Sequence, residues 1–106
     1  MTPPVIGWDL WSSPSVVDTL TGSQAEFQVT VLAQTSLGFG IEDQLVIFRS
    51  YPEIGSFEPD SATTDLNGRA YSSYRVTVSA DTTMVMILIG DEQQLVAQRM
   101  VTLMGR

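Results

Sequence analysis

Short stretches of alternating polar and apolar residues, each closed by turn-forming residues, constrain this chain more than any other feature. Residues 26–31 (EFQVTV) alternate with a period of two, which is typical of a half-buried β-strand. The segments 44–48, 70–78, 84–89 and 94–103 are also strand-like, and glycine or proline punctuates the stretches between them. No 11-residue window has a helical period. The pattern predicts an all-β sandwich or small barrel of six or seven strands.

Composition excludes most kinds of chemistry. The 106 residues suffice for one domain with its own core, but they include no His and no Cys, and all five positive charges are Arg. A Ser or Thr nucleophile therefore has no His or Lys to activate it, and thiolate chemistry is absent. The net charge of −7 opposes nucleic-acid binding, which depends on basic side chains. We expect a non-catalytic protein with no cofactor, no metal ion and no nucleic-acid partner.

The hydrophobic segments do not predict a membrane protein. The longest apolar run, residues 84–89, is far too short to span a bilayer, and the N-terminus lacks the features of a signal peptide. We expect a soluble chain that is not exported by the general secretory route. The run at 84–89 is either a central strand of the sandwich or a strand with one face in the core and the other against a partner. Met100 and Met104 add apolar surface that belongs either to the core or to a contact with a partner.

Acidic residues gather at several expected turns. Asp60, Asp65 and Asn67 could supply oxygen ligands to Ca²⁺, but they do not have the spacing of a recognisable calcium loop. We interpret them as turn residues whose side chains bond the local backbone. The pairs at 42–43 (ED) and 91–92 (DE) are likewise expected at hairpin ends and exposed to solvent, where general acid–base work is not indicated.

The most informative segment is TTDLNGRA at residues 63–70. Asp65, Asn67 and Gly68 are the residue types that a tight turn favours, because they bond the local backbone or tolerate a positive φ. The segment resembles the TTDxxGxA signature of the bacterial Ig-like repeats found in invasin and intimin adhesins. The residues that carry this turn signature are Thr64, Asp65, Asn67, Gly68 and Ala70.

The resemblance extends from about residue 12 to residue 103. Other segments match the family in the expected order, at 13–17, 27–31, 46–48 and 55–59. Residues 34–40 depart from it, because they lack the Asp and Pro of the usual DxxGxP motif, and only one repeat is present. The resemblance implies an Ig-like antiparallel β-sandwich of about seven strands. Residues expected to supply much of its core are Phe27, Val29, Val31, Val46, Phe48, Ala70, Tyr74 and Val76.

An apolar segment precedes the expected start of the domain. We assign residues 12–106 to the Ig-like sandwich and residues 1–11 to an N-terminal apolar arm or extra edge strand. The arm contains both tryptophans of the chain, and Trp is the residue type most enriched in binding hot spots. It is either a strand folded back on the domain or an arm that docks on another chain. The candidate interface residues are Val5, Ile6, Trp8, Leu10 and Trp11.

The leading functional hypothesis is a phage virion decoration protein. Such a module would be assembled in the host cytoplasm and would dock on a major capsid protein or another virion protein. Association with further copies of itself is left open. One alternative is an Ig-like repeat of a bacterial surface adhesin, at the cell surface. Another is a carbohydrate-binding accessory module that stacks sugar rings on the aromatic residues Trp8, Trp11, Tyr51 and Tyr71.

Overall fold

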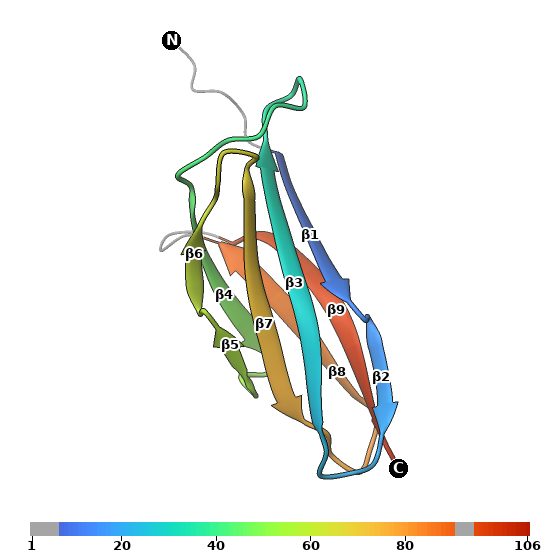
Figure 1. Ribbon diagram of the computed structural model, residues 1–106. Helices are drawn as coiled ribbons and strands as arrows, with labels where there is room; N and C mark the ends of the chain where they lie inside the picture. The colour runs from blue at the N-terminus through green and yellow to red at the C-terminus, as the bar shows by residue number, and fades with distance from the viewer. Residues whose placement is uncertain (1–6, 91–94) are drawn as a thin grey trace.

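Two β-sheets pack face to face in the computed structural model, which describes residues 7–90 and 95–106 (Figure 1). The first sheet has the strand order β1-β3-β7-β5, and the second has the order β2-β9-β8-β4-β6. The prediction of an all-β Ig-like sandwich is confirmed. The strands are β1 (Gly7–Ser13), β2 (Val16–Thr19), β3 (Gln24–Gln34), β4 (Leu45–Tyr51), β5 (Ser56–Glu58), β6 (Ser61–Thr63), β7 (Arg69–Thr77), β8 (Thr83–Gly90) and β9 (Leu95–Gly105).

The described strands number nine rather than about seven because the chain changes sheets twice within short distances. β1 belongs to the first sheet and β2, two residues later, to the second. The three-residue strands β5 and β6 are divided between the sheets in the same way. One pair of strands departs from the antiparallel pattern, since β2 pairs with β9 in parallel. The alternation of side chains along a strand carries no information about its direction or its partner.

β1 lies across the expected boundary between residues 11 and 12. It pairs with β3 in continuous antiparallel register, from Gly7 opposite Gln34 to Ser13 opposite Gln28. The described part of the proposed arm is therefore an edge strand of the first sheet. Residues 1–6 lie outside the described part of the chain.

Alternating residues of the long strands fill the space between the sheets. All eight core residues expected from the sequence are buried, with no more than 3% of any of them exposed. An aromatic cluster closes one part of this core. The ring of Phe57 stacks on Tyr74 at a centroid distance of 4.5 Å and on Phe48 at 5.8 Å. The Tyr74 hydroxyl donates a hydrogen bond of 2.6 Å to the Ile54 carbonyl, so its burial leaves no unpaired donor.

The molecule is elongated, with principal extents of 54 × 23 × 20 Å. β1 begins at one end, where Gly7 pairs with Gln34 and the loops at 35–41 and 64–68 meet. We call this end the β1 pole. At the opposite end, β9 finishes beside the turn at 20–23, and we call this the β9 pole. The two ends of the sandwich's chain therefore lie at opposite poles (Figure 1).

Candidate interaction surfaces

The structure divides the candidate interface residues of the apolar segment between two environments. Leu10 is 7% exposed and belongs to the core, and Trp8 is half-buried and packs against that core. Trp11 points to the outer face of the first sheet, with 44% of its surface exposed. Val5 and Ile6 lie outside the described residues. Of the candidates that the structure describes, Trp11 is the one with a largely exposed side chain.

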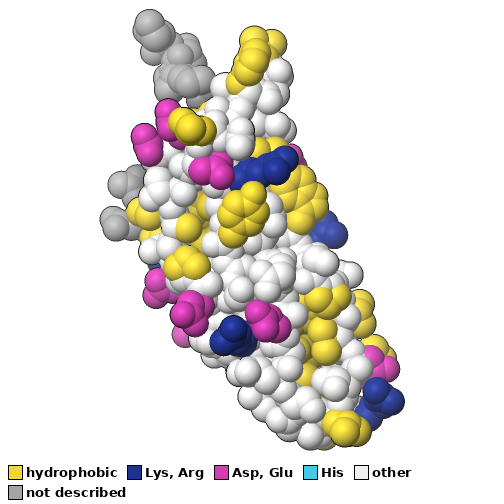
Figure 2. Space-filling view, viewed as in Figure 1, with side chains coloured by type: hydrophobic (Ala, Val, Ile, Leu, Met, Phe, Trp, Pro, Cys, Tyr) yellow, Lys and Arg dark blue, Asp and Glu magenta, His cyan; other side chains and the backbone are white. Residues whose placement is uncertain are grey.

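Trp11 belongs to a row of side chains across the outer face of the first sheet. It lies opposite Thr30 on β3, which in turn lies opposite Tyr71 on β7. Tyr71 is 53% exposed, so the two aromatic side chains flank a threonine on one surface. Tyr51 belongs to the second sheet and Trp8 faces inward. The four aromatic residues considered for sugar stacking therefore do not form one platform. Figure 2 shows hydrophobic, basic and acidic side chains interspersed over this view of the molecule.

The turn signature forms a closed network of hydrogen bonds. One carboxylate oxygen of Asp65 accepts bonds from the backbone N–H groups of Asn67 (2.8 Å) and Arg69 (3.0 Å). Gly68 has a φ of 79°, and a side chain there would collide with the backbone of Ala33. Asp65 is therefore an acceptor for its own turn, and Gly68 is required by both its conformation and its neighbours.

The same signature ties two loops of the β1 pole together. The buried Thr64 hydroxyl donates to the Ile41 carbonyl (2.7 Å) and accepts from the Gln44 N–H (2.9 Å). The Gly68 carbonyl accepts a bond of 2.8 Å from the N–H of Ala33 at the end of β3. The last signature residue, Ala70, is in the core. These contacts explain the motif by folding alone, without any ligand.

Exposed apolar side chains gather at the β1 pole. Leu37, Phe39 and Leu66 are 82%, 68% and 80% exposed, and they lie on the two loops that the signature holds together. Beside them is a hollow of about 640 Å³ whose lining residues are Leu32, Gln34, Gly38, Phe39, Gly40, Leu66, Asn67 and Arg69. These three side chains were not among the candidates expected from the sequence. Large apolar residues between turn-forming residues, as in SLGFG and DLNG, are the signal that could have identified them.

The outer face of the second sheet is also rich in apolar side chains. Along β8, Val85, Ile87 and Ile89 are buried in the core, whereas Met84, Met86 and Leu88 alternate onto the outer face. Met86 lies opposite Met100 on β9 and Tyr51 on β4, which are both exposed. β8 lies between β9 and β4 in the second sheet, so the interpretation of residues 84–89 as a central strand of the sandwich is confirmed. A partner against its outer face stays a prediction.

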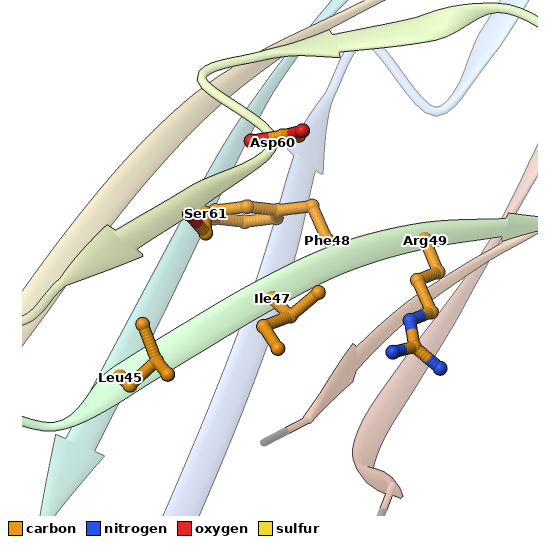
Figure 3. A pocket seen from close by; sticks show the side chains of 6 residues that line it. All are labelled: Leu45, Ile47, Phe48, Arg49, Asp60 and Ser61. Atoms are coloured by element: carbon orange, nitrogen blue, oxygen red, sulfur yellow. The ribbon is translucent and has the colours of Figure 1, made fainter. Parts of the chain in front are cut away.

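A shallow pocket of about 410 Å³ lies on β4 and β6. Its lining residues are Leu45, Ile47, Phe48, Arg49, Asp60 and Ser61. Figure 3 shows Ile47 and Arg49 on one side of β4 and Phe48 on the other, so that the Arg49 guanidinium points away from the Asp60 carboxylate. The pocket therefore brings together no pair of groups suited to acid–base chemistry.

The acidic candidates do not converge on one site in the described residues. Glu42 and Asp43 are exposed, and Asp91 and Glu92 fall outside the described part. Within residues 7–90 and 95–106, no group of three or more His, Cys, Asp or Glu side chains is placed to hold a metal ion. The described chain also contains no helix of the length and hydrophobicity needed to cross a membrane.

Comparisons with known proteins identify the fold and leave the family open. No protein-family model matches the chain, and no curated protein matches it. A solved structure named as the D00-D0 domain of intimin matches with a TM-score of 0.71 and 13% identity, covering 97% of this chain and 50% of that one. Another, named as the D0-D1 domain of intimin, matches with a TM-score of 0.64 and 16% identity, covering 91% and 46%.

Each of these names gives a pair of domains, and the chain spans about half the length of each matched structure. Each match covers more than nine-tenths of this chain. The low identity limits the likeness to the fold. The chain has the Ig-like fold of these intimin domains.

Proposed function

We propose that this chain is a non-catalytic Ig-like repeat of a bacterial surface adhesin, joined end to end with neighbouring domains in a stalk. The observation that carries the proposal is that β1 begins and β9 ends at opposite poles of an elongated sandwich (Figure 1). Domains connected in this way extend a chain by the length of each unit. The fold similarity to two intimin domain pairs supports the same arrangement.

The β1 pole supplies a surface for the preceding domain of such a stalk. Leu37, Phe39 and Leu66 lie on the two loops at the end of the sandwich where β1 begins, and each is at least two-thirds exposed. Exposed apolar residues that cluster on a surface mark interaction sites more often than single ones do. The proposed partner is therefore a neighbouring domain that rests on these three side chains.

The virion decoration hypothesis finds no support in the comparisons. It relied on the apolar segment as an anchor, yet Trp8 and Leu10 pack on the interior of the chain's own sandwich. A capsid or other virion protein as partner, and association between copies, stay predictions. The acidic character of the chain suits a solvated stalk equally well, because a net charge far from zero keeps protein surfaces apart.

Labelling of intact cells tests the proposal. An antibody raised against the 106-residue chain should label the surface of unpermeabilised source cells, and brief protease treatment should remove the label. The matched sample is a preparation of phage particles induced from the same strain. Label on purified particles, with none on cells, would overturn the adhesin proposal and restore the virion hypothesis.

A further inference from the structure

The N-terminal and C-terminal strands of the second sheet are parallel neighbours. β2 pairs with β9 from Val16 opposite Thr102 to Thr19 opposite Gly105, and this is the one parallel pair among the described strands. Backbone bonds continue at both ends of the paired segment. The N–H of Thr102 donates to the Ser15 carbonyl (3.0 Å), and the N–H of Arg106 donates to the Thr19 carbonyl (2.9 Å).

Tension along a stalk would act on these strands lengthwise. The proposed function places the preceding domain at the β1 pole and the following domain at the β9 pole, so the two ends are pulled in opposite directions. β2 and β9 both run toward the β9 pole (Figure 1). The pull reaches β2 from its N-terminal end and β9 from its C-terminal end. The strands can then separate only by sliding past each other, which loads all of their hydrogen bonds together.

β1 adds a second ladder that is loaded in the same way. Its seven residues pair with β3 along the long axis of the molecule, and the pull acts on the Gly7 end. Leu10 and Trp8 fix β1 to the core from the inner side. Sliding β1 along β3 would therefore break seven paired positions and withdraw a buried side chain at the same time.

We propose that β1 and β2 form a clamp that bears tension between the two poles, β1 by shear against β3 and β2 by shear against β9. The inference rests on the proposed stalk function, because only a chain held at both ends experiences this load. The inner side of the β2–β9 pair is shielded by Val17 and Leu103, which pack in or against the core. The ion pair between Arg106 and Asp18 (3.0 Å) is exposed and adds little.

Pulling the protein apart in two different directions tests the clamp without substituting any residue of the β1–β3 or β2–β9 pairs. The chain has no cysteine, so introduced cysteines define the points of attachment in single-molecule force spectroscopy. One protein carries a cysteine added at each end of the chain, and a second carries Leu20→Cys with the cysteine at the C-terminal end. Leu20 lies beside Arg106 at the β9 pole, since the N–H of Thr21 bonds the Arg106 carbonyl (3.0 Å). Pulling these two points apart opens the β2–β9 pair one bond at a time.

The expected result is a several-fold higher unfolding force for the end-to-end pull than for the pull from Leu20. Forced unfolding reports the unfolding barrier in the pulled direction, so equilibrium stability alone does not produce such a difference. Equal forces in the two directions would overturn the clamp. Surface labelling of cells tests the stalk role separately, so failure of one proposal is distinguishable from failure of the other.

A pair of substitutions locates the resistance within the fold. Val17→Pro removes a backbone N–H from the paired part of β2, whereas Phe57→Ala removes a core side chain from β5, which is outside the clamp. Both variants should unfold at lower urea concentration. We expect the end-to-end unfolding force to fall sharply for Val17→Pro and to stay close to that of the unaltered chain for Phe57→Ala. If the end-to-end unfolding force fell in both variants in proportion to their loss of stability in urea, this result would contradict the clamp.

Discussion

Tyr74 shows how one buried polar residue connects the core to the pH dependence of folding. Its ring is fully buried between Phe27 and Phe57, and burial raises the pKa of its hydroxyl above 10.0, against a smaller opposing effect of Ser50. The native state therefore favours the neutral phenol. In the unfolded chain the phenol ionises at its ordinary pKa, so the unfolded state loses its proton first as the pH rises.

The expected consequence is a loss of stability in alkaline solution. The free energy of unfolding should be unaffected by Tyr74 below about pH 9.5 and should fall above pH 10, by at most about 1.4 kcal/mol per pH unit. Tyr74→Phe should remove this part of the slope. Tyr74→Phe should also lower the free energy of unfolding at neutral pH by about 1 kcal/mol, because it removes the hydrogen bond to the Ile54 carbonyl. That carbonyl still accepts a hydrogen bond from the Ser50 hydroxyl, so it is not left unpaired. Urea unfolding at several pH values measures both effects, with the exposed Tyr71→Phe as control. An unchanged alkaline slope in Tyr74→Phe would contradict this account.

The Asp65 carboxylate offers a second prediction at the scale of one residue. Asp65→Ala removes the acceptor for two backbone N–H groups of the signature turn and should reduce the free energy of unfolding by about 1 kcal/mol. Asp65→Asn retains an acceptor oxygen at the same place and should lose less. Thermal or urea unfolding of the two variants gives the comparison. Equal losses would mean that the charge matters more than the turn geometry.

At the scale of the element, β1 shows that an apolar segment near the chain end can be part of the fold. Its alternation places Leu10 inside and Trp11 outside, although both had been considered for the same interface. Sequence alone identified the apolar character of the segment. It did not decide the direction of each side chain, because that direction depends on pairing with β3, about twenty residues further along the chain.

The division of β1 into two faces predicts different outcomes for neighbouring substitutions. Leu10→Ala should lower the free energy of unfolding by about 2–4 kcal/mol, since it empties a site between the sheets. Trp11→Ala should cost clearly less, because almost half of that side chain is already exposed. Chemical denaturation measures both. A mild effect of Leu10→Ala, equal to that of Trp11→Ala, would show that β1 is dispensable for folding.

At the scale of the whole molecule, opposite poles and an apolar β1 pole imply end-to-end stacking. Two copies joined head to tail should scatter X-rays as a rod of about twice the 54 Å length. The angle between the two units should vary little. Replacing Leu37, Phe39 and Leu66 with Ser should loosen the joint and broaden the distribution of distances. Each unit should keep its stability, because these side chains are exposed.

A matched triple substitution at Met84, Met100 and Tyr51, on the outer face of the second sheet, should leave the joint unchanged. Identical scattering from both triple variants would contradict a role for the β1 pole.

The sequence by itself determined the five long strands β3, β4, β7, β8 and β9, the eight core residues and the signature turn. Each of these depends on local rules: the period of two along a strand, and the preferences of Asp65, Asn67 and Gly68 in a tight turn. The tertiary structure alone decided the change of sheet between β1 and β2, the parallel pairing of β2 with β9, the burial of Leu10 and the packing of Trp8 against the core. It also brought Leu37, Phe39 and Leu66 to one pole. These outcomes arise from hydrogen bonding and packing between segments far apart in the chain, and no local pattern records which segments will meet.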